Sequence, residues 1–274
     1  MSETAPGTPR PDYSRLFRLD GRTAVVVGGG SGIGREGSLA LAAHGAKVVV
    51  ADRNLEAAAE TVDLGATSAA AAGAGELSAY ALDVLDEPAV MRAASELGVV
   101  DVLVYSAGRN VRKRVLDYTS EEFDLVIGLN LRAAFTCVRA FAPGMAERGR
   151  GSIIGLSSIR SMTVEPGQSM YASTKAGLLQ LLRTVAAELG PQGVRANTVA
   201  PGVVRTPLTG PILADPEWER AYAEKNAFQR WATPDEIAGA IVFLASDASS
   251  YVTGAQILVD GGWTAVDGRF TPPS

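Results

Sequence analysis

Residues 22–34 read RTAVVVGGGSGIG, and this stretch decides the fold. Residues 22–27 predict a short buried strand, and a helical stretch follows the glycines as far as Ala43. A glycine-rich turn between a strand and a helix lets the backbone approach a pyrophosphate, and the helix N-terminus offers free N–H groups to the anion. The stretch therefore predicts the first strand–turn–helix unit of a dinucleotide-binding fold.

Six more short apolar runs predict strands, and helical stretches separate them along the chain. The runs are Lys47–Ala51, Leu77–Leu82, Val99–Tyr105, Gly151–Ser158, Val194–Val199 and Gln256–Val259. Residues 121–148 predict one long helix between two of them. Alternating strands and helices give a parallel sheet that is covered on both faces. We therefore expect an α/β fold, a Rossmann-like doubly wound parallel sheet in a single domain.

The domain is expected to run from residue 21 to residue 274 of the 274-residue chain. Residues 1–20 contain three prolines and no hydrophobic period, which predicts a flexible tail or an arm on the surface. Residues 205–230 are rich in prolines and aromatics, and they predict a mobile lid like the closing loops of other enzymes.

Composition excludes several classes of protein. The net charge of −5 argues against a nucleic-acid surface. The only cysteine, Cys137, rules out an internal disulfide, and the only histidine, His44, leaves neither a Ser-His-Asp triad nor a Cys/His metal cluster. No apolar run approaches the length of a membrane span, and the N-terminus lacks the layout of a signal peptide. We expect a cytoplasmic protein without a metal or a membrane partner.

An acidic residue follows the second predicted strand. Asp52 lies 18 residues after Gly34, close to the spacing of an acid that bonds the adenosine ribose of a dinucleotide. Its carboxylate would repel a 2′-phosphate, which favours NAD over NADP. Arg53 keeps NADP open because it could pair with a phosphate. Alternatively, Asp52 caps the helix that begins near Asn54.

Residues 157–175 read SSIRSMTVEPGQSMYASTK and contain the candidate chemistry. Tyr171 and Lys175 are four apart at the start of a predicted helix, so they share a face. A nearby positive charge favours phenolate and lowers the pKa of a tyrosine, which can then exchange a proton with a substrate oxygen. Ser158 ends a predicted strand, where open α/β sheets bind ligands.

These motifs resemble the short-chain dehydrogenase/reductase family, and the resemblance spans about Gly21 to Trp263. The family's turn reads T-G-x-x-x-G-x-G; here its glycines are Gly28, Gly32 and Gly34, and its threonine is replaced by Val27. The family's Asn-Asn-Ala-Gly is present only as Ala107-Gly108, because Tyr105 and Ser106 replace both asparagines. The side-chain bonds of those asparagines must then come from elsewhere.

The resemblance implies a role for each catalytic candidate. Tyr171 is the general acid or base, Lys175 lowers its pKa and holds the nicotinamide ribose, and Ser158 positions the substrate oxygen. Asn130 anchors a water in a proton relay. The resemblance also implies a homotetramer packed through helices near 120–148 and 171–190.

The cofactor contacts come from the glycine-rich turn and from the carboxyl ends of successive strands. They are Gly28, Ser31, Gly32, Ile33, Gly34, Asp52, Arg53, Asp83, Val84, Ala107, Gly108, Tyr171, Lys175, Pro201, Gly202, Val204 and Thr206. Ser31 supports NAD, because NADP users of the family often carry a basic residue there.

The substrate contacts are expected between Ser158 and Tyr171, with Arg160 and Gln168 as candidates and Met162 and Glu165 beside them. A basic run follows the fourth strand, at Arg109, Arg112, Lys113 and Arg114. It is either a solvated face or a patch that attracts an anionic substrate.

The chain therefore reads as an enzyme that transfers hydride reversibly between NAD and a secondary alcohol or its ketone. Polar residues around the site suggest a polyol or a sugar as the substrate. Two alternatives stay open. One is an NADPH-dependent 3-oxoacyl-carrier-protein reductase, and the other is a dinucleotide-bound scaffold without turnover.

Overall fold

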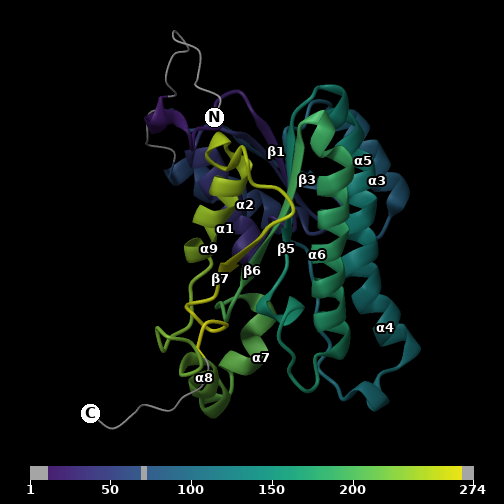
Figure 1. The fold of residues 1–274 in the computed structure, drawn as a ribbon, viewed down its shortest axis with the longest axis vertical. Coiled ribbons are helices and arrows are strands. Elements are labelled where there is room, and N and C mark those ends of the chain that lie inside the picture. The colour runs from purple at the N-terminus through teal and green to yellow at the C-terminus, as the bar shows by residue number, and fades with distance from the viewer. Residues whose placement is uncertain (1–11, 69–72, 267–274) are drawn as a thin grey trace, which may run out of the picture.

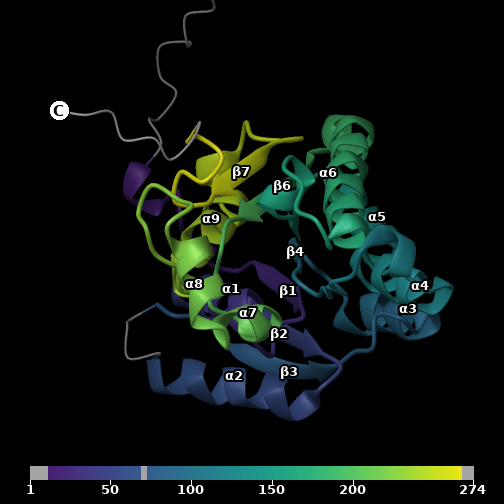
Figure 2. The same cartoon turned by 90° about the horizontal axis from the view of Figure 1, so that it is seen from below.

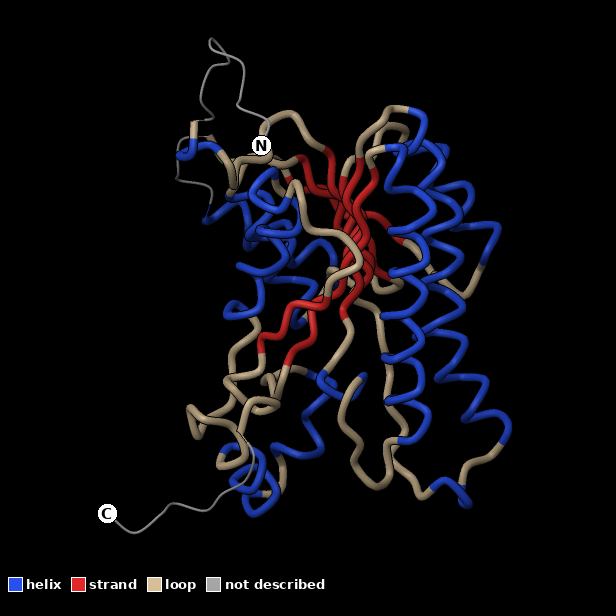
Figure 3. The backbone as a smooth tube through the Cα atoms, in the orientation of Figure 1, coloured by secondary structure: helices blue, strands red, loops and turns tan. Residues whose placement is uncertain are grey.

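A seven-stranded parallel sheet separates two layers of helices (Figures 1 and 3). The computed structural model describes residues 12–68 and 73–266. The strands are β1 (Thr23–Val27), β2 (Lys47–Asp52), β3 (Leu77–Ala81), β4 (Val102–Tyr105), β5 (Gly151–Leu156), β6 (Val194–Pro201) and β7 (Gln256–Val259). Their order is β3-β2-β1-β4-β5-β6-β7, and every neighbouring pair is parallel. The predicted doubly wound α/β fold is confirmed.

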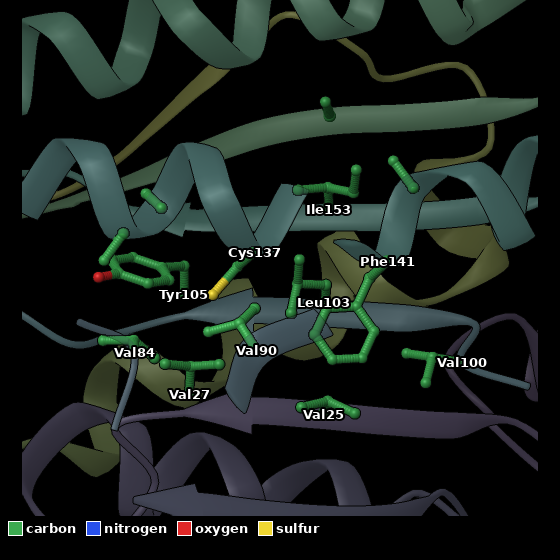
Figure 4. Close-up of a cluster of buried hydrophobic side chains, with 14 of the residues drawn as sticks. Val25, Val27, Val84, Val90, Val100, Leu103, Tyr105, Cys137, Phe141 and Ile153 are labelled. Atoms are coloured by element: carbon green, nitrogen blue, oxygen red, sulfur yellow. The ribbon is translucent and has the colours of Figure 1, made fainter. Parts of the chain in front are cut away.

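Alternate residues of β1 face opposite helical layers. Ala24 and Val26 belong to a core shared with α1 (Gly32–Ala43) and α9 (Asp235–Ala245). Val25 and Val27 belong to the other core, which contains Leu103, Ile153, Cys137 and Phe141 (Figure 4). A strand buried on both faces needs apolar residues at every position, which is why this run is continuous.

The remaining helices complete the two layers and cover one end of the sheet. They are α2 (Leu55–Ser68), α3 (Glu87–Leu97), α4 (Ser120–Ile127), α5 (Ala133–Glu147), α6 (Ser169–Leu189), α7 (Gly210–Leu213) and α8 (Pro216–Ala223). Helices α1, α2 and α9 lie on one side, and α3, α4, α5 and α6 lie on the other (Figure 1). Helices α7 and α8 lie across the end of the sheet, as the view from below shows (Figure 2).

The single helix expected over residues 121–148 is wrong in one respect. A π-helical segment, Gly128–Arg132, separates α4 from α5. The Tyr105 hydroxyl donates a hydrogen bond to the Leu129 carbonyl inside this segment. Tyr105 stands where the family that the sequence resembles has an asparagine, so here a phenol ties the central strand to the helix. Single π-helical turns often occur at functional sites.

The stretch Ser120–Glu147 is long and apolar enough to cross a membrane by length and composition alone. Half of its most apolar 18-residue window is buried, and Ala134, Cys137 and Phe141 pack in the core against the sheet. This is the position of a core helix in a layered α/β domain.

Part of the predicted tail belongs to the folded core. Leu19 is fully buried, and its N–H donates to the His44 carbonyl. A short 3-10 helix, Tyr13–Arg15, precedes it and is capped by Asp12. The expectation of a free tail is therefore wrong at Leu19, and residues 1–11 lie outside the described part of the chain.

Candidate active site

A cavity of about 450 Å³ opens at the carboxyl ends of the central strands. The sheet order reverses direction there, between β1 and β4, and open α/β sheets bind ligands at such switch points. Every residue predicted to contact the cofactor lines this cavity except Gly34. Ser158, Tyr171 and Lys175 line the same cavity. Asn130 is fully buried and does not line it.

Two glycines of the turn are required by contacts that leave no room for a side chain. Gly28 has φ +78°, and a Cβ there would lie 2.8 Å from the Ala107 nitrogen in the loop after β4. A Cβ on Gly34 would lie 2.1 Å from the Gly28 carbonyl oxygen. Gly34 therefore acts beneath the loop, where it holds the first turn of α1 against the end of β1.

Asp52 supports the glycine-rich turn from the side. Its Oδ2 accepts from the Gly30 nitrogen at 3.0 Å, and its Oδ1 accepts from the Asn54 nitrogen at 3.0 Å. Asn54 caps α2, because its Oδ1 accepts from the nitrogens of Glu56 and Ala57. The alternative that Asp52 is the helix cap is therefore wrong. Arg53 is exposed at the same rim.

Tyr171 is set into the wall of the cavity at the start of α6. Burial raises the pKa of its phenol, while a hydrogen bond with Ser158 and the positive charges of Arg160 and Arg112 oppose that rise. Two arginines therefore supply positive charge near the phenol, and the expected lowering of this pKa by Lys175 stays a prediction. The phenol is therefore held in its protonated form at neutral pH.

Lys175 is buried directly beside Tyr171. Its Nζ donates to the Leu156 carbonyl at 2.7 Å and lies 5.4 Å from the centre of the Tyr171 ring. Burial lowers the pKa of the ammonium to about 8. The side chain can therefore gain or lose its charge near the pH at which the protein would work.

Replacing Lys175 by Met should make stability less dependent on pH. An unfolded lysine has a pKa near 10.4, above the value of about 8 in the folded protein. Below pH 8 burial of the charged lysine lowers the unfolding free energy of the wild type by its full amount. This loss disappears as the pH rises toward 10.5. The advantage in unfolding free energy of K175M over the cofactor-free wild type should therefore fall by about 3 kcal/mol between pH 7 and pH 10.5.

Urea denaturation at the two pH values measures this difference. Lys47 is exposed at the start of β2, so K47M serves as the matched control and should show little change. If K175M and wild type differed in unfolding free energy by the same amount at both pH values, the lowered pKa of Lys175 would be contradicted.

Asn130 clamps the loop after β4. Its Oδ1 accepts from the Arg109 nitrogen and its Nδ2 donates to the Arg109 carbonyl, both at 2.8 Å, while Nδ2 also reaches Thr174 Oγ1 at 3.1 Å. A Cβ on Gly108 would lie 3.7 Å from Asn130 Oδ1 and 3.5 Å from Lys175 Nζ. The side chain thus fixes the backbone against which Lys175 lies.

Sequence reasoning did not identify the apolar part of the cavity wall. Leu82, Leu85, Leu125, Leu129, Leu156 and Leu208 all line the cavity. Leucines that line a cavity and leucines that fill a core have the same pattern in a sequence. Their role could be read only after the loops were placed.

The two predicted substrate residues lie in a network centred on Glu165, outside the cavity lining. Glu165 Oε1 accepts from Arg112 at 3.1 Å and from the Tyr222 hydroxyl of α8. Glu165 Oε2 accepts from Arg160 and from Gln168. Glu165 therefore joins three segments that the sequence separates, and Met162 beside it is exposed.

The basic run divides between different environments. Arg112 turns toward Glu165, and Lys113 pairs with Glu122. Arg109 and Arg114 are exposed. The run is therefore divided: Arg112 belongs to the network, Arg109 lines the cavity, and Lys113 and Arg114 lie on the surface. Attraction of an anionic substrate by the run stays a prediction.

The segment expected as a lid packs on an aromatic cluster. The Tyr222 ring stacks on Trp231 and also contacts Trp218 and Trp263. Ile212 of α7 is buried in the same cluster. Helices α7 and α8 are therefore held beside the Glu165 network by aromatic contacts and by the Tyr222–Glu165 bond.

Comparison with known proteins gives consistent relatives. Residues 28–264 match a family model described as Enoyl-(Acyl carrier protein) reductase. The chain is 41% identical over 258 residues to Galactitol 2-dehydrogenase (L-tagatose-forming) from Cereibacter sphaeroides, covering 92% of this chain and 99% of that enzyme.

Solved structures show the same architecture. A short-chain type dehydrogenase/reductase from Mycobacterium marinum matches with a TM-score of 0.85 and 33% identity, covering 92% of this chain and 99% of that one. A gluconate 5-dehydrogenase from Burkholderia cenocepacia, in complex with NADP and tartrate, also has a TM-score of 0.85 and 33% identity, with 92% and 98% covered.

Proposed function

This chain belongs to the short-chain dehydrogenase/reductase family, and on that premise we propose that it oxidises a secondary alcohol group of a polyol or sugar with NAD. Its relatives support an oxidoreductase that acts on CH–OH groups with a nicotinamide dinucleotide. One observation carries the proposal: a single cavity contains the glycine-rich turn and also Ser158, Tyr171 and Lys175.

The residues at the turn fit a dinucleotide. The tight packing of Gly28 and Gly34 leaves bare backbone at the N-terminus of α1, where a pyrophosphate would meet N–H groups. Asp52 stands at the rim, where a carboxylate would accept hydrogen bonds from ribose hydroxyls. Nicotinamide dinucleotide, when bound, supplies the acceptor for the hydride.

The chain's own residues handle the proton. Tyr171 in its ionised form takes the proton of the substrate hydroxyl in oxidation, and in its protonated form it returns the proton in reduction. Ser158 hydrogen-bonds with Tyr171 and holds the substrate oxygen beside it. Lys175, held by the Leu156 carbonyl, supplies a charge next to the ring and a donor toward the nicotinamide ribose. Asn130 keeps the Arg109 backbone in place behind them.

We expect the Asp52→Ala variant to shift the cofactor preference. Losing hydrogen bonds to a charged group costs about 1.5–3 kcal/mol, so the Kd for NAD should rise about 10- to 100-fold. The Kd for NADP should stay level or fall, because the repulsion of the 2′-phosphate is gone. Calorimetric titration of wild type and D52A with both cofactors measures this, followed by a panel of alcohols with the preferred one.

Unchanged NAD binding in D52A would refute the role of Asp52. Wild-type preference for NADP would mean that Arg53 decides, and it would move the proposal to an NADPH-dependent 3-oxoacyl-carrier-protein reductase. The 36% identity to the 3-oxoacyl-[acyl-carrier-protein] reductase of Thermotoga maritima supports that second candidate. Binding of either dinucleotide with no turnover on any alcohol or ketone would favour a scaffold.

We also place the enzyme in the cytoplasm as a homotetramer packed through α4, α5 and α6. Exposed Phe123 and Phe135 on that layer support an interface there, since large exposed apolar side chains mark association surfaces.

A further inference from the structure

The side-chain network beside Tyr171 carries more positive charge than its one carboxylate, that of Glu165, can neutralise. Arg112 and Arg160 both pair with Glu165, which is the carboxylate of this network. Lys225 adds a third cation over the Trp263 ring. The nearby Arg205 is paired with Glu219, and Lys113 with Glu122, so those cations are balanced. A local surplus is notable in a chain whose net charge is −5.

Glu165 has no capacity left for a substrate hydroxyl. A carboxylate offers about four lone-pair sites. Arg112, Arg160, Gln168 and Tyr222 already donate to its two oxygens. The two guanidinium groups together carry about ten N–H donors, and besides Glu165 the Thr163 hydroxyl accepts from Arg160. The acceptor sites of the Glu165 carboxylate are therefore occupied, whereas the network is rich in N–H donors.

The network is fixed in position relative to the catalytic residues. The Arg160 nitrogen donates to Ser158 Oγ at 3.1 Å, and Gln168 is the residue that precedes α6, three positions before Tyr171. A parallel bridge joins Lys113 to Gln168 and holds Arg112 next to that helix start. The side chain of Arg112 is 27% exposed and that of Arg160 is 9% exposed, so Arg112 is the accessible member.

Aromatic side chains cover the two cations. Arg112 lies 5.1 Å from the centre of the Trp218 ring, and Arg160 lies 5.5 Å from that of Trp263. Rings that exclude water strengthen the attraction between a guanidinium and an anion. The arrangement suits a small anion better than a neutral group.

We propose that the substrate is a hydroxy acid, whose carboxylate is bound by Arg112 while Glu165, itself paired with Arg160, holds Arg112 in place. This inference rests on the proposed function and names its substrate class. Arg112 is thus a residue that determines specificity, and Glu165 is a positioning residue. A polyhydroxy acid would place its carboxylate at the network and one secondary hydroxyl at Ser158 and Tyr171.

The experiment compares a hexonate with the hexitol of the same configuration. The kcat/KM of each is measured for wild type, R112M and R114M. Arg114 is exposed, so R114M is the matched control with the same loss of charge two positions away. Wild type should prefer the hexonate. R112M should lose about 10- to 100-fold on the hexonate, mainly through KM, because a charge-assisted bond is gone.

In R112M the hexitol should lose clearly less than the hexonate, since it lacks the carboxylate and is affected only through the charge that Arg112 supplies near Tyr171. Both substrates should change by less than about threefold in R114M. R112K keeps the charge and should recover part of the loss. The inference of a hydroxy-acid substrate would be overturned if wild type preferred the hexitol, or if R112M lost kcat/KM equally on both substrates. Either result would leave the proposed dehydrogenase activity unaffected.

A second measurement separates the two proposals. Calorimetry on the NAD-loaded Tyr171→Phe variant reports binding of hexonate and hexitol without turnover. Tighter binding of the hexonate by this variant, together with no oxidation of either compound by the wild type, would keep the anion site and reject the proposed reaction. Equal binding of both compounds would reject the anion site.

Discussion

The Tyr171→Phe variant is expected to lose about 10²- to 10⁴-fold in kcat. The change removes one oxygen from a residue already packed in the cavity wall, so the fold and the cofactor groove should be unaffected. What is lost is the group that exchanges a proton with the substrate oxygen. Because burial raises the pKa of this phenol, oxidation by wild type should become faster as the pH rises and more of the side chain ionises.

Steady-state kinetics from pH 6 to pH 10 measure both effects. The residual rate of Y171F should lack the alkaline rise. Tyr80 of β3 is the matched control, since its hydroxyl bonds to Glu96 on α3, outside the cavity, and Y80F should keep wild-type turnover. Full activity in Y171F with unchanged cofactor binding would show that another group moves the proton.

The Gly34→Ala variant should have the second large effect. The added methyl would lie 2.1 Å from the Gly28 carbonyl oxygen, which is backbone and cannot turn aside. Overpacking of this kind costs about 1–3 kcal/mol or more. If the loop moves to relieve it, the cradle for the pyrophosphate is lost, and about 3 kcal/mol corresponds to a rise of about 100-fold in the Kd for the dinucleotide.

Thermal unfolding and calorimetry with NAD would detect these losses. Gly239 is also helical, in α9, and among the described residues no atom lies within 4 Å of the position of an added Cβ. The same substitution there, G239A, should leave cofactor binding unchanged and raise stability by up to about 1 kcal/mol. Normal binding and stability in G34A would show that the first turn of α1 can shift without cost.

The fold could be predicted from the sequence because its strands are short apolar runs between turns. β7 begins and ends at the expected residues, and β1 begins one residue after the expected start. β4 begins at Val102 and not at Val99, which is half exposed and precedes the sheet. Local patterns decide such elements, so one sequence was enough.

The interruption of the long helix could not be predicted in the same way. A π-helical turn depends on bonds made to other parts of the chain, here from Tyr105 to Leu129 and from Asn130 to Arg109. Neither bond has a signature in the local sequence. The departure from the family's asparagine was visible at Tyr105, but its new partner was not.

Within the site, residue types were easier to predict than electrostatic partners. Tyr171 and Lys175 lie together as their spacing required, yet the charges that oppose the raised pKa of Tyr171 belong to Arg160 and Arg112. Arg112 is 59 positions before Tyr171 in the chain. Glu165 likewise gathers partners from three segments, which only the folded chain brings together.

The strand order has a consequence for synthesis on the ribosome. β1 is central in the finished sheet, with β2 on one side and β4 on the other. β2 and β3 emerge soon after β1, but β4 follows by about 80 residues, or roughly 4–16 s of translation. Through that interval the nascent chain presents an unpaired strand edge that is apolar from Ala24 to Val27, which is a template for aggregation. The demand of this protein for chaperones should therefore be concentrated before β4 leaves the exit tunnel.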